Sequence, residues 1–311
     1  MSAAQTYRST AARSRARAAV PGRTPASPPW RAAKGVLLLI CCLLVIVPFL
    51  SIVATSLADN EQVTEAGGFV LWPERPSFAA YSAVLAGGVV TRALAVSVGV
   101  TVAGTALALL SSITLAYGLS RPGTFGHRPV LMILLFSLLF TPGVIPSYLL
   151  IKQLGLINSY WSLILPTMVN AFNVIVLRAF FMGLPRELLD AARIDGANAL
   201  QILRRIVVPL SRAAIAVVGL FYAVSFWNAF FNAMLYMNES ESWPMQLVLR
   251  TYVVNNAAIG AGEVSVAGAA LPPSYALQAA ILVLSIVPIV VVYPFLQRHL
   301  RKGVMIGAVK G

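Results

Sequence analysis

Six long apolar stretches decide what this chain of 311 residues can fold into. Each approaches or exceeds the roughly 20 residues that a helix needs to cross about 30 Å of hydrocarbon. Only 11% of the residues are charged, against about a quarter in soluble domains. We therefore predict an all-α, polytopic membrane protein with six transmembrane helices in one domain, residues 35–297. The stretches lie at residues 35–57, 91–118, 130–152, 158–182, 210–232 and 277–297.

The third stretch is the least regular because it contains Pro142, Gly143 and Pro146. Proline lacks a backbone N–H and its ring clashes with the preceding helical turn, so a helix bends or breaks there. Broken backbone is tolerated at membrane depth only where protein or a cavity satisfies the freed polar groups. We expect this break to lie near one membrane face.

The distribution of basic residues predicts the orientation of the chain. If the N-terminus is cytoplasmic, only Arg75, Arg92, Lys152 and Arg250 of the 23 basic residues fall outside. Seven of the ten acidic residues then fall outside as well. Both termini and the polar segment 184–209 are therefore predicted to be cytoplasmic.

Two tails flank the membrane domain. Residues 1–34 are rich in Ala, Arg, Ser and Pro, have few large apolar residues, and are predicted to be disordered. Residues 298–311 form a cytoplasmic C-terminal tail. The net charge of +13 could suggest nucleic acid, but the basic residues lie between apolar stretches and in the tails. Membrane topology explains that distribution, so we predict contact with lipid and none with nucleic acid.

The first apolar stretch has a competing interpretation as a signal peptide. The tripeptide Ser56-Leu57-Ala58 resembles a small-x-small cleavage site. However, the apolar core of about twenty residues exceeds the usual 7–15 of a signal peptide, and the basic leader is unusually long. An uncleaved anchor is the favoured interpretation. Cys41 and Cys42 are adjacent in this stretch, where helical neighbours point in different directions and do not favour a structural disulfide.

The polar segment 184–209 carries ordered local signals. Pro185, with acidic Glu187 and Asp190 behind it, predicts the start of a helix. Gly196 predicts its end because glycine adopts the left-handed conformation easily. Asn198 then predicts the cap of a second short helix that ends before Pro209.

The same segment has a surface suited to protein contact. Ala191, Ala192 and Ala197 give low relief, while Asp190 and Asp195 offer carboxylates for salt bridges. An ordinary cytoplasmic loop is the alternative, with arginines that only set the topology. That alternative explains the arginines but not the ordered pattern of Pro, acidic, Ala and Gly residues.

The order of residues in this segment resembles the EAA loop of ABC importer permeases. The likeness lies in DAARIDGA at 190–197 followed by IVVP at 206–209. Further blocks resemble the smaller, maltose-transporter-like permeases of the carbohydrate branch of that family. They are IPSYLLIKQLGLINSYWSLILP at 145–166, SFWNAFFNAMLYMNES at 225–240 and KGVMIGAVKG at 302–311. The resemblance covers the chain from about residue 35 to its C-terminus, and it implies a type I ABC importer permease fold with cytoplasmic coupling helices.

The resemblance also implies partners and a cargo. The EAA loop of that family sits in a cleft of a cytoplasmic ATPase, and two ATPase copies, a second homologous permease and an extracytoplasmic solute-binding protein complete the importer. The cargo would be a sugar or oligosaccharide, carried across the bacterial cytoplasmic (inner) membrane. The candidate ATPase-coupling residues are Glu187, Asp190, Ala191, Ala192, Asp195, Gly196 and Ala197.

The sequence departs from the family pattern in two places. The leading Glu of the loop is Asp190, one methylene shorter, which places a salt bridge to the ATPase differently. A proline usual a few residues after Pro209 is Ala213, which should let the next helix begin more regularly. In the C-terminal tail, Lys302 and Lys310 are candidate ATPase contacts, with lipid headgroups as the alternative partner.

Polar residues inside the fourth and fifth stretches are candidates for a substrate pathway, because such groups are costly in the bilayer and usually face a cavity or another helix. Amides can pair with sugar hydroxyls, and aromatic rings can cover the apolar face of a sugar. Hydrogen bonding between helices is the alternative, and we favour it for any one residue alone. For the cluster as a whole we favour the pathway. Its members are Asn170, Asn173, Tyr222, Ser225, Trp227 and Asn228.

Catalytic and nucleotide-binding patterns are missing from the sequence. The two histidines, His127 and His299, fall in basic segments, and no metalloprotease, serine-hydrolase or P-loop motif occurs. We expect neither an enzyme nor a cofactor or metal site in this chain; ATP and Mg would be bound by the partner ATPase. The rival function is an ATP-independent secondary transporter or channel. It would call for ionisable residues inside the stretches, and none of the six contains an acidic residue.

Overall fold

The computed structural model describes residues 28–86, 88–121, 123–255 and 273–308. Within these ranges every extended regular element is a helix, which confirms the predicted all-α class. The chain divides into two units, residues 1–50 and 51–311.

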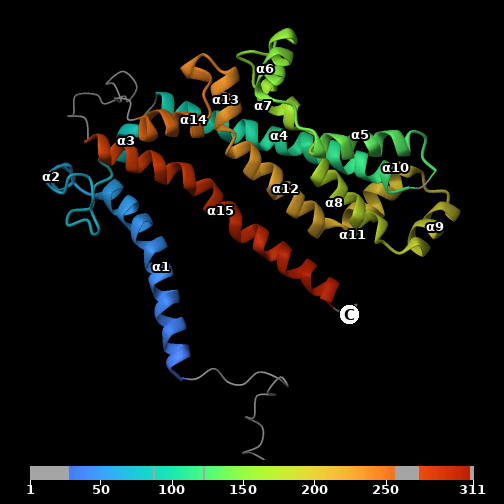
Figure 1. Cartoon of the computed structure of the whole chain (residues 1–311), viewed down its shortest axis with the longest axis horizontal. Helices are drawn as coiled ribbons and strands as arrows, with labels where there is room; N and C mark the ends of the chain where they lie inside the picture. The colour runs from blue at the N-terminus through green and yellow to red at the C-terminus, as the bar shows by residue number, and fades with distance from the viewer. Residues whose placement is uncertain (1–27, 87, 122, 256–272, 309–311) are drawn as a thin grey trace, which may run out of the picture. The chain divides into compact units, whose positions relative to one another are not determined.

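Unit 1 contains most of helix α1 (Pro28–Leu57), drawn in blue in Figure 1. The helix begins at Pro28 and not at residue 35, because prolines suit a first helical turn and alanines follow them. One turn further along, the Lys34 ammonium lies 5.2 Å from the centre of the Trp30 ring. Residues 1–27 of the tail that we expected to be disordered lie outside the described residues.

Unit 2 is organised around the long helix α4 (Val89–Leu119), which packs against α8 (Ala171–Met182) and α12 (Arg212–Trp227) (Figure 1). Helix α12 also packs against α15 (Ser274–Ala308). At Gly104 of α4, an added Cβ would lie 2.9 Å from the Phe226 ring, so only glycine allows this approach. The remaining helices are α2 (Asn60–Glu65), α3 (Ala79–Leu85), α5 (His127–Leu139), α6 (Val144–Gln153), α7 (Trp161–Ile164), α9 (Arg186–Ile194), α10 (Ala199–Ile202), α11 (Val208–Leu210), α13 (Phe230–Tyr236) and α14 (Met245–Leu249).

Three helical segments of the described chain are long and apolar enough to cross a membrane unaided: Ala32–Leu57, Val89–Leu119 and Ser274–Pro294. Two further candidates are bent pairs, Trp161–Thr167 with Ala171–Met182 at 50° and Ala199–Leu210 with Arg212–Trp227 at 85°. The count of six crossings stays a prediction. The expected break in the third stretch is confirmed, because α5 ends at Leu139 and α6 begins at Val144.

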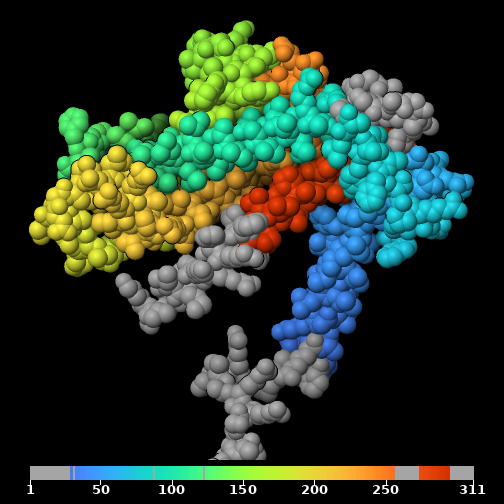
Figure 2. Space-filling view, turned by 180° about the vertical axis from the view of Figure 1, so that it is seen from behind, coloured from blue at the N-terminus to red at the C-terminus, as the bar shows by residue number. Residues whose placement is uncertain are grey.

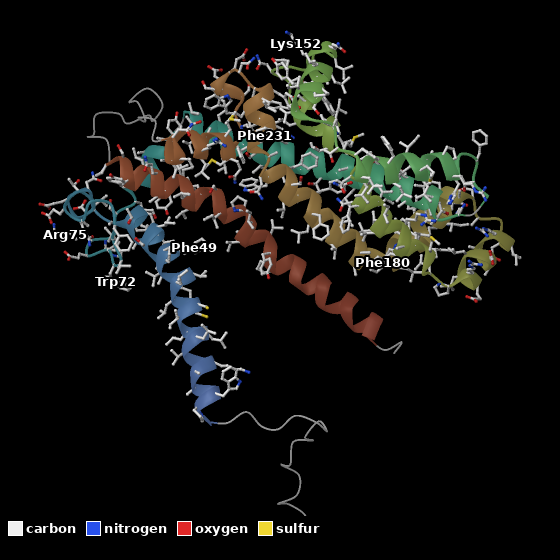
Figure 3. All side chains as sticks on the ribbon, viewed as in Figure 1. Phe49, Trp72, Arg75, Lys152, Phe180 and Phe231 are labelled. Carbon is white, nitrogen blue, oxygen red and sulfur yellow. The ribbon has the colours of Figure 1, made fainter. Side chains whose placement is uncertain are left out.

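Large apolar side chains cover much of the outside of unit 2. Trp72, Phe180 and Phe231 are 81%, 55% and 42% exposed and point away from the ribbon in Figure 3. Helix α5 adds Phe136 and Leu139, which are 62% and 77% exposed. Such an apolar exterior is expected of a protein surrounded by lipid and by partner subunits.

Candidate coupling segment and membrane pocket

We use the name coupling segment for residues 184–209. Its first helix, α9, follows Pro185 and carries Glu187 in its first turn and Arg193 in its last, as the helix dipole favours. Leu189 and Ala192 pack against the core of unit 2. The coupling segment and its neighbours project at one end of unit 2, in yellow in Figure 2.

The first helix ends at a glycine turn, as predicted. Gly196 has φ +76°, and its N–H donates to the Arg193 carbonyl over 3.0 Å. The next amide, of Ala197, donates to the Ala192 carbonyl over 2.9 Å. These bonds satisfy carbonyls that the end of a helix leaves open.

The second helix is capped by Asn198, which confirms another prediction. The Asn198 Oδ1 accepts from the backbone N–H of Gln201 over 2.9 Å, and the Gln201 Oε1 accepts from the backbone N–H of Asn198 over 2.8 Å. This reciprocal pair is a capping box, and the sequence analysis missed the part played by Gln201.

The predicted end before Pro209 is wrong. The helix continues from α10 through a π-helical turn, Leu203–Val207, into α11, and it bends at Ser211. A π-helical turn changes the hydrogen-bond register directly before Pro209, so the helix continues past a residue that has no backbone N–H to donate. The next helix does begin without a proline, at Arg212.

Hydrogen bonds tie the coupling segment to the end of α4. The Tyr117 hydroxyl donates to the Ala199 carbonyl over 3.0 Å. In the same region Arg178 Nε of α8 donates to the Leu119 carbonyl over 2.8 Å. Ile202 and Val207 are buried in the core of unit 2, each 1% exposed. Helix α10 is therefore joined to α4 by a hydrogen bond, and the segment that follows it is packed into the core.

The candidate coupling residues divide into an outer and an inner set. Ala192 and Ala197 are half-buried against the core. Asp190 pairs with Arg193 over 2.7 Å, and both side chains are exposed. The exposed candidates are Glu187, Asp190, Ala191, Asp195 and Gly196.

Two apolar residues beside the glycine turn were not predicted to belong to the site. Ile194 ends α9 and is 87% exposed, while Leu200 near the start of α10 is 69% exposed. Their signal was present in the sequence, since large aliphatic residues are unexpected in an exposed polar loop. Both side chains are uncovered, and we refer to these two exposed residues as the Ile194–Leu200 surface.

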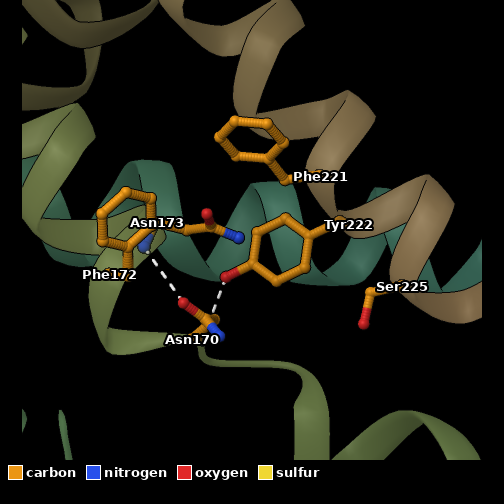
Figure 4. A pocket seen from close by; sticks show the side chains of 6 residues that line it. All are labelled: Asn170, Phe172, Asn173, Phe221, Tyr222 and Ser225. Atoms are coloured by element: carbon orange, nitrogen blue, oxygen red, sulfur yellow. Dashed lines mark hydrogen bonds between the residues drawn. The ribbon is translucent and has the colours of Figure 1, made fainter. Parts of the chain in front are cut away.

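A second site lies between the start of α8 and α12. A pocket of about 360 Å³ opens there, and four of the six predicted pathway residues line it (Figure 4). Two aromatic rings that the sequence analysis did not single out complete the lining. The lining residues are Asn170, Phe172, Asn173, Phe221, Tyr222 and Ser225.

Tyr222 and Asn170 hold this pocket together. The Tyr222 hydroxyl lies 2.7 Å from Ser112 Oγ of α4, and it accepts a hydrogen bond from the backbone N–H of Asn170 over 3.0 Å. Asn170 caps α8, because its side-chain Oδ1 accepts a hydrogen bond from the backbone N–H of Asn173 over 3.1 Å. These two residues therefore make the bonds between and within helices that were the alternative to a pathway.

Asn173 differs from these two residues. The side chain is 5% exposed, and Figure 4 shows its amide turned toward the Tyr222 ring. Within the described residues no hydrogen bond to this side-chain amide is present. A buried amide at a pocket wall has donors and an acceptor available for a ligand or for water.

The structure separates the last two pathway candidates from the pocket. The Trp227 indole is 5% exposed, and its Nε1 donates to the Ser285 carbonyl of α15 over 3.1 Å, so it joins two helices. Asn228 follows the end of α12 and is exposed. In the described part of the chain, no cluster of His, Cys, Asp and Glu suits a metal ion.

Apolar helices that are repeatedly broken, a polar pocket between two of them and a projecting two-helix segment define a multi-pass membrane permease. Over residues 31–306 the sequence matches the family described as "Binding-protein-dependent transport system inner membrane component". The chain belongs to this family of inner-membrane proteins, whose members are transport permeases and not enzymes.

Relatives and a solved structure agree with that assignment. The polygalacturonan/rhamnogalacturonan transport system permease protein YtcP of Bacillus subtilis is 42% identical over 88% of this chain and 96% of its own length. Protein LplC of the same organism is 41% identical over 86% of this chain and 90% of its own length. A crystallised bacterial ABC transporter involved in the import of the acidic polysaccharide alginate has a chain that matches with a TM-score of 0.80. The two chains are 30% identical, and the match covers 90% of this chain and 99% of the other.

Proposed function

We propose that this chain is a permease subunit of an ATP-driven ABC importer and forms a translocation pathway for a sugar or oligosaccharide across the cytoplasmic membrane. The names of its relatives support a carbohydrate cargo, since YtcP is named for polygalacturonan and rhamnogalacturonan and the solved importer for alginate. The observation that carries the ATP-driven part is the coupling segment with its exposed Ile194–Leu200 surface.

The pocket between α8 and α12 is the proposed pathway. The Asn173 amide can pair with sugar hydroxyls, and the Phe172 and Phe221 rings, 53% and 45% exposed, can cover the apolar face of a pyranose. Tyr222 and Asn170 frame the pocket through their bonds to each other and to α4. Trp227 joins helices and does not line the pathway. Asn228 has no role in the pathway or in helix packing.

The coupling segment is the proposed docking site for a cytoplasmic ATPase, which binds ATP and Mg in place of this chain. An apolar surface on a charged segment becomes more stable when a partner covers it. A second homologous permease, two ATPase copies and an extracytoplasmic binding protein complete the proposed importer, with both termini of this chain in the cytoplasm.

The bonds of the coupling segment suggest how ATPase motion reaches the pocket. Closure of the ATPase pair would move α10, which is joined to α4 through Tyr117 and Ala199. Helix α4 carries Ser112, whose hydroxyl meets Tyr222 at the pocket. The account is therefore alternating access by rigid movement of packed helices.

The rival function is transport without an ATPase, and uptake in proteoliposomes distinguishes the two. The complete complex is reconstituted with its binding protein and sugar, with either an active ATPase or one that binds but does not hydrolyse ATP. We expect uptake only with the active ATPase. Equal uptake with both would establish the rival function and reject ours.

A further inference from the structure

A second pocket, of about 300 Å³, lies between the coupling segment and the end of α4. Three guanidinium groups line it, those of Arg121, Arg186 and Arg193. Asp190 is the one acidic residue in the same lining. We name it the arginine pocket.

Arg121 is one of the residues that line the arginine pocket, and part of its guanidinium lacks hydrogen-bond partners among the described residues. Its Nε and one terminal nitrogen are buried, with no hydrogen-bond partner among the described residues. The group is held in place, because its central carbon lies 4.1 Å from the centre of the Tyr117 ring. An aromatic face attracts the cation but leaves the N–H groups at its edge unbonded.

The one carboxylate of the arginine pocket does not satisfy Arg121. Asp190 is engaged with Arg193 over 2.7 Å. The pKa of the Arg121 guanidinium is lowered first by burial and then by the positive charge of Arg193. Arg121 therefore lies in an environment that disfavours its charge, and a bound anion would offset that effect.

The shape of the unbonded edge indicates which anion fits. The fork of a guanidinium matches the two oxygens of a carboxylate or phosphate. The Asp190 carboxylate in the lining repels a doubly charged phosphate more strongly than a singly charged carboxylate. Four of the lining residues, Arg186, Leu189, Asp190 and Arg193, belong to α9, the helix that also carries exposed Ile194.

We propose that the arginine pocket receives an aspartate or glutamate side chain of the ATPase subunit and that Arg121 is the residue that binds it. This inference rests on the proposed docking of the ATPase at the coupling segment and adds a chemical partner to it. Apolar contact at the Ile194–Leu200 surface supplies adhesion, while the arginine pocket fixes the register of the ATPase against α4. Arg121 directly follows Ser120, the cap of that helix.

The first test measures ATPase affinity for the complete permease pair in nanodiscs of neutral lipid. Arg121→Gln should weaken binding at least about tenfold, since it removes one partner of a partly buried charge pair. Arg121→Lys keeps the charge but loses the fork, and we expect an intermediate value. Arg128→Gln is the matched control, because Arg128 is exposed at the start of α5 and does not line the arginine pocket.

The second test identifies the partner group by charge reversal. Arg121→Glu is combined in turn with a lysine substitution at each acidic residue of the ATPase surface. One combination should restore binding and uptake that Arg121→Glu alone abolishes. Copurification of the partner permease shows that each variant is folded; if Arg121→Gln fails to fold, Arg121→Lys and Arg186→Gln carry the test.

Three outcomes would overturn the inference. ATPase affinity unchanged in Arg121→Gln would remove the role of Arg121. If Arg121→Gln weakens ATPase binding only in nanodiscs with anionic lipid, the arginine pocket binds a lipid headgroup. If inorganic phosphate competes with ATPase binding to the parent chain, the arginine pocket binds a free anion. In each case Ile194→Asp still releases the ATPase if docking at the coupling segment is correct, whereas retention of the ATPase by Ile194→Asp rejects the proposed function itself.

Discussion

The coupling segment and the membrane pocket differ in how their polar and apolar groups are satisfied. In the coupling segment, Ile194 and Leu200 are exposed, and Arg121 beside it has buried N–H groups without partners in the described chain. At the membrane pocket, the Tyr222 hydroxyl bonds both Ser112 of α4 and the backbone N–H of Asn170 at the start of α8. Among the described residues, the first site leaves polar and apolar groups unsatisfied, whereas the second has a frame that the chain supplies itself.

This difference predicts two kinds of mutant. Changes in the coupling segment should impair uptake by impairing contact with the ATPase, with little effect on insertion into the membrane. Changes at the pocket should alter either affinity for the sugar or stability of the helices, depending on whether the residue faces the cavity or bonds a neighbouring helix.

The largest effect is expected from Gly196→Pro. Proline fixes φ near −65°, while Gly196 has φ +76° and uses its N–H to bond Arg193. Uptake should fall to background in proteoliposomes while membrane insertion stays at the parent level. Gly196→Asn is the control, because asparagine tolerates the left-handed conformation, and it should keep most of the uptake. Normal uptake by Gly196→Pro would show that the glycine turn has no coupling role.

A smaller effect is expected from Asn173→Ala at the pocket. Loss of one hydrogen bond to the sugar should raise the KM for uptake roughly three- to tenfold. The thermal stability of the purified complex should change little, because the side-chain amide has no bond within the described residues. Asn228→Ala provides a matched asparagine outside the pocket, and an equal rise in KM for both variants would argue against this pathway.

Tyr222→Phe should act on stability more than on affinity. It removes the hydroxyl that bonds both Ser112 and the backbone N–H of Asn170. We expect the free energy of unfolding to fall by about 1–2 kcal/mol. Thermal unfolding in detergent measures this loss. Ser112→Ala removes one of the two bonds and should cost less; unchanged unfolding in Tyr222→Phe would mean that the tyrosine is not a structural junction.

The smallest effect is expected from Asn198→Ala. It removes the side-chain acceptor of the capping box and should destabilise the start of α10 by about 1 kcal/mol. Hydrogen exchange of the α10 amides should become faster, and uptake should fall only partly. Asn198→Ser retains a capping oxygen and should behave like the parent chain, so equal exchange in all three proteins would contradict the cap.

The coupling segment could be predicted well because its signals are local. Pro185, Gly196 and Asn198 act through bonds within a few residues of themselves, and the structure has the helix ends near them. The prediction failed at Pro209, because a π-helical turn carries the helix past that proline and nothing in the sequence pattern marks such a turn. Exposure of Ile194 and Leu200 depends on how the segment packs, which its sequence does not state.

The pocket could be predicted only in part because it forms from distant segments. Four polar candidates line it, but the sequence did not reveal that Tyr222 would reach Ser112, or that Trp227 would bond α15. Phe172 and Phe221 looked like ordinary apolar residues within two long stretches. Their role as walls depends on the approach of α8 to α12, which periodicity alone does not fix.

The central claim is that the coupling segment binds the ATPase that drives transport. The most direct measurement is the amount of ATPase that copurifies with the permease pair when Ile194 and Leu200 are both changed to Asp. Our account predicts that the ATPase is lost, that the partner permease is retained and that uptake falls to background. Retention of the ATPase together with uptake at the parent level would contradict it.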